Sequence, residues 1–295
     1  MWLVFAVGSV IAWSFALVMD SILVKNYEKD PFVLMWVQSC VSIVFLSIAA
    51  FFVPFETAWL PWLILTSLIA YCGDIILFAA MDRMDASVIN ITWAFLAIFL
   101  SAVGFIFFGE SWTTLQTVAV VCILGGVGFL SYWHHHVTYF ALFLLVAIAA
   151  LFTPSNAVVK AALDSGEVLI TVVFWQLCAR EVFSFVFPWT MPSFRRRIKA
   201  LPAKVDALFY WIAFLVIVAY FLGMYLMAEA FKSGSISLVS VVGNIQPFVV
   251  LFMAWCVWKL FPRYAAKELL DGQSVFVKLT CFSIVFSGLA LLAFS

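Results

Sequence analysis

Charged residues are scarce in this sequence. Lys, Arg, Asp and Glu together make up 10% of its 295 residues, against about 25% in an average soluble domain. Hydrophobic residues make up 67%, and the mean hydropathy is +1.18. A water-soluble globule needs more polar surface than this, and a disordered chain contains fewer apolar residues. The composition therefore predicts a polytopic membrane protein.

Motifs of several other functions are missing. The sequence contains no phosphate-binding GxxxxGK[ST] loop, no HExxH and no GxSxG motif, so we expect neither direct use of ATP nor enzyme activity, and no cofactor. The consecutive His134, His135 and His136 lack the spacing of a zinc site, so we expect no metal ion. Fifteen basic residues balance 15 acidic ones, which excludes a basic field for nucleic acid.

Two further absences concern processing and disulfides. No Lys or Arg precedes Lys25, so the basic region of a cleaved signal peptide is not found, and the first apolar run is expected to stay as a membrane span. The six cysteines form no CxxC pair and lie inside apolar runs. We therefore expect small buried side chains rather than disulfides or metal ligands.

Long apolar segments fill the chain. A membrane span needs about 20 mainly apolar residues, and ten segments qualify. Their expected limits are 2–24, 32–53, 59–81, 86–108, 113–132, 138–159, 168–190, 207–229, 235–258 and 275–294. Most connections are short, so consecutive helices are expected to pack antiparallel. The fold class predicted is an all-α integral membrane protein with ten transmembrane helices.

The two halves of the chain repeat short patterns in the same order. Gln38 and Cys40 in the second segment recur as Gln176 and Cys178 in the seventh, Val24-Lys25 recurs as Val159-Lys160, and Ala86-Ser87 recurs as Ile236-Ser237. Together these matches predict two five-helix repeats, 1–133 and 134–295. An odd number of spans places the second repeat upside down relative to the first, as in many secondary transporters.

One stretch of the first half, residues 80–130, resembles an EamA domain of the drug/metabolite transporter superfamily. The features that carry the resemblance are Ala86-Ser87, Gly109-Glu110, Thr113 with Gln116, and Gly125-Gly126, spread around a long apolar run. The second half repeats the pattern over 230–255 and has Pro247 where the family usually has a proline. It departs from the family with Lys259-Leu260 in place of Gly-Glu, and the first half departs with Ala97 at the proline position.

The resemblance covers essentially the whole chain and implies a secondary transporter. Members of the superfamily move small metabolites, amino acids, nucleotide-type compounds, choline-like cations or drugs, so the resemblance leaves the substrate open. The family's ten-helix members usually have both termini inside the cell.

Basic residues are distributed unevenly between the two sides of the expected bundle. The connections after the first, third, fifth, seventh and ninth segments share one side and hold 11 basic residues, whereas the other side holds only Lys160 and Lys232. The positive-inside rule then places the basic side in the cytoplasm and both termini outside, opposite to the family habit. We expect a multi-pass protein of the plasma or inner membrane.

Ionisable residues at membrane depth are the main candidates for function, since each costs about 2.5–3.5 kcal/mol to insert. Arg180 and Glu181 fall near the middle of the seventh segment, and Gln176 lies one turn before Arg180 on the same face. We expect Gln176 and Arg180 to line a central cavity, where Arg180 holds a substrate anion or a carboxylate of another helix. The alternative is an ion pair that serves only packing.

Three other carboxylates are candidates for proton coupling. Asp74 has no cation near it in sequence, and a carboxyl group isolated in an apolar site binds a proton more readily than one in water; it could equally be the partner of Arg180. Asp20 is similar but has Lys25 nearby, and Glu229 lies near the end of its segment. Lys25 and Lys160 lie at segment ends, where extension to the interface is the simpler interpretation.

Polar and aromatic residues complete the candidate substrate site. Asn244 and Gln246 adjoin Pro247, which removes a helical hydrogen bond and predicts an irregular backbone at mid-depth. Interhelical amide bonding is the alternative role for these amides. The matching first-half residues and the mid-span tryptophans are also candidates for binding substrate, the alternative being helix packing: Asn90, Trp93, Trp13 and Trp36.

The function predicted is therefore a secondary active transporter, an exporter of a small metabolite or drug-like molecule by alternating access. We expect proton antiport through Asp74, Glu181, Glu229 or Asp20, with the lipid bilayer and a small-molecule substrate as partners and no nucleic acid. A lipid-moving protein, or a binding or scaffold protein that transports nothing, is the alternative.

Overall fold

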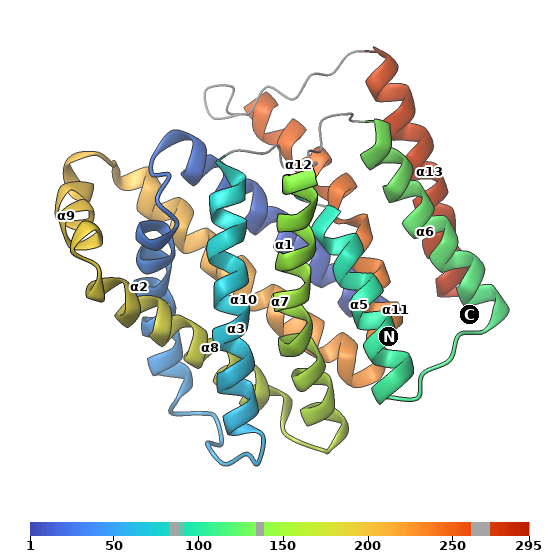
Figure 1. Ribbon diagram of the computed structural model, residues 1–295, viewed down its shortest axis with the longest axis horizontal. Helices are drawn as coiled ribbons and strands as arrows, with labels where there is room; N and C mark the ends of the chain where they lie inside the picture. Colours follow the sequence, from blue (N-terminus) through green and yellow to red (C-terminus); the bar gives the residue numbers. More distant parts are fainter. Residues whose placement is uncertain (83–88, 90, 134–138, 261–271, 295) are drawn as a thin grey trace.

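The computed structural model describes residues 1–82, 89, 91–133, 139–260 and 272–294. Within these residues all regular secondary structure is helical (Figure 1). The α-helices are α1 (Trp2–Asn26), α2 (Pro31–Ala49), α3 (Leu60–Met81), α5 (Ile91–Phe107), α6 (Thr114–Trp133), α7 (Tyr139–Asp164), α8 (Leu169–Val186), α9 (Pro192–Ala200), α10 (Ala207–Ser233), α11 (Ile236–Val242), α12 (Gln246–Leu260) and α13 (Gly272–Ala293). Short 3₁₀ turns follow α8, α9 and α11: η1 (Phe187–Thr190), η2 (Leu201–Ala203) and η3 (Gly243–Ile245).

Each of the ten apolar segments expected from sequence contains one of these helices or a broken helix. In the described part, seven helices are long and apolar enough to cross a membrane, counting α11 to α12 as one. Three shorter apolar helices lie in α5, α6 and α13. The all-helical membrane fold is thus confirmed, whereas the inverted ten-span repeat stays a prediction.

Helix starts follow from local capping chemistry. The carboxylate of Asp30 accepts the backbone N–H of Phe32 at 2.9 Å at the start of α2, where Pro31 occupies the first turn. Asp206 caps α10 by accepting the N–H of Phe209 at 3.1 Å. Both caps satisfy N–H groups that have no partner within the helix itself.

The expected irregularity near Pro247 is confirmed. The chain leaves the α-helical pattern over η3 and resumes it in α12, which begins just before this proline. A proline ring cannot donate to the preceding turn. The helix is therefore divided into α11 and α12 near its middle.

Most of the packing joins the first half of the chain to the second. Helix α1 packs on α10, α11 and α12, α3 packs on α7 and α8, α5 packs on α7 and α11, and α6 packs on α13. Figure 1 shows α6 and α13 side by side at one edge of the bundle, with α2, α8 and α9 toward the opposite edge. Two buried apolar clusters fill the space between these helices.

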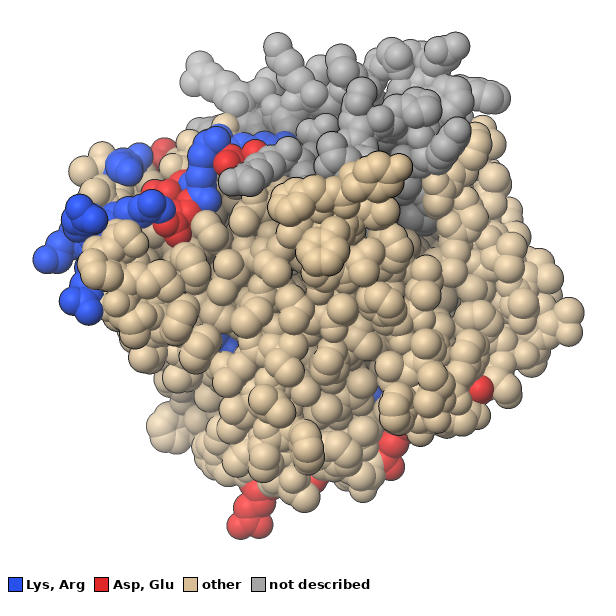
Figure 2. Space-filling model, viewed as in Figure 1, with Lys and Arg blue, Asp and Glu red and all other residues tan. Residues whose placement is uncertain are grey.

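Charges gather at the two ends of the bundle. Figure 2 shows Lys and Arg gathered with some acidic groups at one end of the visible face, and acidic groups at the other end. The basic end includes α9, whose Arg195, Arg196 and Lys199 are exposed while Phe194 is buried. The middle of this face shows few charged side chains, as expected of a surface that contacts lipid (Figure 2).

Candidate functional site

A cavity of about 160 Å³ lies among α1, α2, α3, α5, α7, α8, α10 and the α11–α12 helix. Both halves of the chain contribute to its wall. Its polar lining comprises Asp20, Gln38, Ser67, Asp74, Ser155, Asn156, Gln176, Arg180, Glu181, Tyr220, Ser240 and Gln246. An engineered protein cavity of about 150 Å³ admits benzene, so this cavity is large enough for a small molecule.

Arg180 on α8 is the centre of the charged groups in the cavity wall. Its Nε lies 2.7 Å from Oδ2 of Asp74 on α3. Its guanidinium lies over the ring of Tyr220 on α10, 4.4 Å from the ring centroid, in a cation–π contact. Asp74 is therefore the carboxylate partner of Arg180. The sequence had left two roles open for Asp74, this pairing and proton coupling.

Two further carboxylates line the cavity near this pair. Oδ1 of Asp20 accepts a hydrogen bond from Nε2 of Gln38 at 2.6 Å, and both side chains are buried. Glu181 is also buried and lies near Ser39 and Ser42 of α2, but the Ser39 hydroxyl donates to the carbonyl of Met35 at 2.8 Å and the Ser42 hydroxyl has no hydrogen-bond partner among the described residues. A neutral amide therefore solvates Asp20.

Gln176 lies one helical turn before Arg180, as expected. Its Nε2 donates to the hydroxyl of Ser155 on α7 at 2.7 Å. Its Oε1 is buried and accepts no hydrogen bond from any described residue. Gln176 thus lines the cavity and carries a buried acceptor that no described residue satisfies.

The structure brings eight of the sequence-predicted residues together in this wall: Trp13, Asp20, Asp74, Trp93, Gln176, Arg180, Glu181 and Gln246. Adjacent Arg180 and Glu181 both reach the cavity although they point in different directions on α8. Sequence reasoning missed Gln38, Ser155 and Tyr220 as lining residues. Gln38 had a usable signal, since it is the repeat counterpart of Gln176, but nothing in the sequence indicated Tyr220.

Three predicted residues lie elsewhere. Asn244 is buried at the η3 break, where its Nδ2 donates to the carbonyl of Val241 at 3.2 Å. Trp36 stacks on Phe185 with ring centroids 5.7 Å apart. Glu229, near the end of α10, accepts the hydroxyl of Tyr225 at 3.2 Å. Asn90 and the histidines 134–136 lie outside the described residues.

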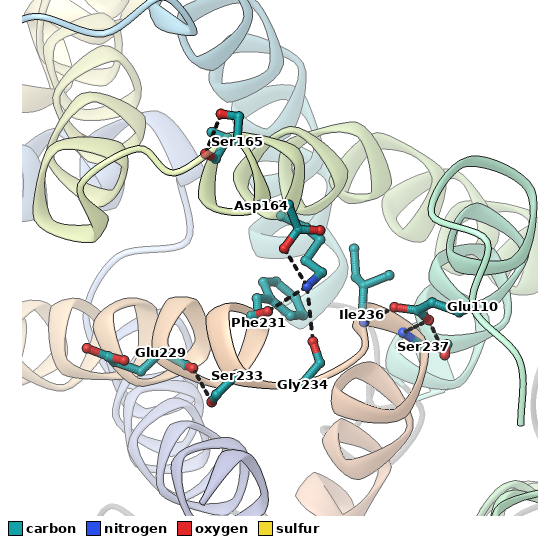
Figure 3. Close-up of polar contacts among 11 residues, drawn as sticks. Glu110, Asp164, Ser165, Glu229, Phe231, Ser233, Gly234, Ile236 and Ser237 are labelled. Atoms are coloured by element: carbon teal, nitrogen blue, oxygen red, sulfur yellow. Dashed lines mark hydrogen bonds and ion pairs between the residues drawn. The ribbon is translucent and has the colours of Figure 1, made fainter. Parts of the chain in front are cut away.

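A second group of polar contacts surrounds the turn between α10 and α11, outside the residues that line the cavity (Figure 3). The carboxylate of Glu110 binds the N–H of Ile236 at 2.6 Å, and the hydroxyl of Ser237 donates to the same carboxylate. Lys160 Nζ donates to the carbonyl oxygens of Phe231 at 2.9 Å and Gly234 at 3.2 Å. We call these contacts of Glu110 and Lys160 the α10–α11 clasp.

The environment of Lys160 corrects the expectation from sequence. The residue is 8% exposed and pairs with Asp164 at 2.8 Å, so it does not extend to the interface. Lys25, its repeat counterpart, is exposed. Side chains packed beneath the clasp include Phe231, Ile236 and Val239, all fully buried. None of these residues lines the cavity.

Comparison with known proteins agrees with this architecture. Residues 1–132 match the profile of the EamA-like transporter family. Among curated proteins no match was found. A solved crystal structure, described only as that of a protein, is similar with a TM-score of 0.67 and 14% sequence identity, over 98% of this chain and 95% of the other.

At that identity the structural likeness concerns the fold alone, and the family match concerns the first half of the chain. Members of this family are membrane transporters of small molecules, in agreement with the apolar helices and the cavity described above. The chain is an integral membrane protein, and its residues 1–132 are similar to the EamA-like transporter family.

Proposed function

We propose that this protein is a secondary active transporter that moves a small molecule through the central cavity by alternating access, driven by protons, in the direction of export. The observation that carries the proposal is the cavity itself, which joins Arg180 to the buried carboxylates Asp20, Asp74 and Glu181. Charges at membrane depth are costly and mark substrate or proton pathways.

Helix contacts support two inverted repeats, 1–133 and 134–295. Under the repeat, α1 corresponds to α7, α2 to α8, α3 to α10, α5 to α11–α12 and α6 to α13. The contact between α1 and α10 then corresponds to the contact between α7 and α3. In the same way, the contact between α5 and α7 corresponds to the contact between α11–α12 and α1. The contact of α3 with α8 likewise corresponds to that of α10 with α2. Two-fold related halves produce this pairing.

Hydrogen bonds inside the cavity repeat in the same way. Asp20 stands five residues before Lys25, as Ser155 stands five residues before Lys160. Gln38 donates to Asp20, and its counterpart Gln176 donates to Ser155. The cavity therefore lies where two equivalent helix pairs meet, the position of substrate sites in transporters built from inverted repeats.

Closure at one end supports alternating access. Within the α10–α11 clasp, Glu110 joins the first half to Ile236 of the second, whereas the contacts of Lys160 lie within the second half. The clasp lies at the end of the bundle where Figure 1 marks the termini, and the described cavity lining excludes its residues. Exposed basic residues occur at the other end, which the positive-inside rule places in the cytoplasm. We place the termini and the clasp on the outer side.

Proton coupling is assigned to the buried carboxylates. Asp74 and Glu181 both interact electrostatically with Arg180, as does Asp20. One guanidinium cannot neutralise three carboxylates, so protons are needed when no other cation is bound. Glu229 is the weakest candidate, since it lies outside the cavity wall.

The test is flux in vesicles containing the purified protein and a pH-sensitive dye. A panel of amino acids, quaternary amines, nucleosides and phosphorylated metabolites is applied, and a transported compound is expected to cause saturable proton movement. Asp74→Asn and Glu181→Gln are expected to abolish it, whereas the exposed carboxylate variant Glu56→Gln serves as the matched control. Unchanged coupling in both cavity variants would exclude these carboxylates. A complete lack of saturable flux would favour the lipid-moving or scaffold alternative.

A further inference from the structure

The cavity wall carries more acidic than basic groups. Among the described residues that line it, Arg180 is the one cation, against the three carboxylates of Asp20, Asp74 and Glu181. These carboxylate residues are only 8%, 5% and 5% exposed, in that order. Water therefore does little to screen their charge.

Only one of the three carboxylates contacts the guanidinium. Asp74 lies 2.7 Å from Arg180 Nε, whereas Asp20 accepts a hydrogen bond from the neutral amide of Gln38. Glu181 forms no ion pair with any described residue and lies near the neutral Ser39 and Ser42. Hydrogen bonds from neutral groups orient a carboxylate without neutralising it. A buried carboxylate without a counter-ion is costly, so Asp20 and Glu181 are left to attract a cation from the cavity.

An independent feature also favours a hydrogen-bond donor as ligand. Gln176 is 7% exposed, and its Oε1 has no donor among the described residues although its Nε2 is bonded to Ser155. A buried acceptor without a partner costs about 1–3 kcal/mol. An N–H group of a ligand in the cavity that Gln176 lines would satisfy it.

The rest of the wall suits an organic cation rather than a metal ion. No three His, Cys, Asp or Glu side chains in the described part of the chain are grouped closely enough to hold a metal. The wall includes the indole of Trp93, stacked on Phe152 with ring centroids 6.0 Å apart, and the indole of Trp13. Aromatic faces attract ammonium groups and pack on apolar bodies.

We propose that the cavity binds a small organic cation, a protonated amine with an aromatic or aliphatic body. The surplus carboxylates of Asp20 and Glu181 supply the opposing charge, Gln176 Oε1 accepts an N–H, and the aromatic wall holds the body. This inference rests on the proposed function in taking the cavity as the transport site, and it names the class of substrate.

The test uses three probes of nearly equal size and different charge. Benzylamine, benzyl alcohol and benzoate are titrated into the purified protein by isothermal calorimetry, at a pH where the amine is protonated and the acid ionised. Benzylamine is expected to bind most tightly and benzoate least. Failure of benzylamine to bind, or a preference for the alcohol or benzoate, would overturn the proposal without any variant.

Two variants then locate the binding. Asp20→Asn and Glu181→Gln are each expected to weaken benzylamine binding about tenfold or more, since each removes one charge of a buried pair. They are expected to leave benzyl alcohol nearly unchanged. Glu56→Gln, an exposed carboxylate outside the cavity, is the matched control. Equal loss of affinity for the amine and the alcohol would indicate a general disturbance of the cavity and contradict the charge argument.

Flux measurements separate this inference from the proposed function. Saturable transport of a neutral or anionic compound with no amine binding would refute the cation inference and retain the transporter. Benzylamine binding that depends on Asp20 and Glu181, without flux of any amine across the vesicle membrane, would support the cation site and refute transport.

Discussion

The carboxylate of Glu110, in the loop after α5, binds the backbone N–H of Ile236 at the start of α11 at 2.6 Å. It also accepts the N–H of Ser237 at 3.1 Å. Two glycines permit this approach. Gly109 has a φ of 63°, which turns the chain sharply after α5, and a Cβ at Gly104 would overlap the Glu110 carboxylate. The Gly-Glu pair that suggested the family thus joins the two halves of the chain.

We expect Glu110→Ala to destabilise the protein by about 1–2 kcal/mol, because it leaves N–H groups at a helix start without their acceptor. Thermal unfolding in detergent measures the effect. Glu167→Ala is the matched control, since the Glu167 carboxylate accepts a single backbone N–H among the described residues, that of Ala58 at 3.2 Å. An effect of Glu110→Ala no larger than the control would show that the contact contributes little.

Lys160 and Lys25 should respond differently to the same change. Lys160→Met removes a cation from the carbonyl oxygens at the end of α10 and should cost about 1–3 kcal/mol. Lys25→Met should cost less than about 0.5 kcal/mol, because the side chain is exposed. Unfolding temperatures of the two variants test this, and similar losses at both positions would contradict the burial of Lys160.

The ion pair of Arg180 with Asp74 predicts strong coupling between their variants. Arg180→Met alone leaves the buried carboxylates without their cation and should cost about 3–5 kcal/mol. Adding Asp74→Asn should recover part of that loss, because it removes one of the uncompensated charges. A double-mutant cycle on unfolding measures the coupling, and strictly additive effects would contradict the contact.

Gly223→Ala is expected to weaken ligand binding from outside the cavity wall. A Cβ at this position of α10 would overlap the indole of Trp13, which lines the cavity. Displacing the ring should reduce benzylamine affinity severalfold. Gly125→Ala, where an added Cβ meets nothing within 4 Å, is the control. Equal affinities in the two variants would exclude a role for the Trp13 position.

Several features of the site could be read from sequence because they are local. Gln176 and Arg180 share a helical face by their spacing, and the structure places both in the cavity wall. Pro247 interrupts its helix wherever the helix packs, as η3 confirms. The sequence offered Asp74 as one candidate partner of Arg180 but could not decide the pairing, because Asp74 lies on a helix more than one hundred residues away in the chain.

Matching the two halves of the sequence does not predict which positions carry a buried charge. When the two halves are aligned on Ser87 and Ser237, Asp74 corresponds to Met224. Both residues line the cavity. At this pair of positions the predicted repeat agrees with the cavity lining, whereas the residue types differ between the halves. Lys25 and Lys160 match in sequence as well, yet only Lys160 is buried.

That this protein is a helical membrane protein, and where its apolar helices lie, follows from the amino-acid sequence alone. A bilayer offers no hydrogen bonds to the backbone, so the backbone groups of long apolar segments must bond to each other. Which buried groups meet depends instead on how the helices pack. Helix packing brings Asp20 to Gln38, Asp74 to Arg180 and Glu110 to Ile236, because contacts across a bundle depend on the rotation and depth of each helix against its neighbours.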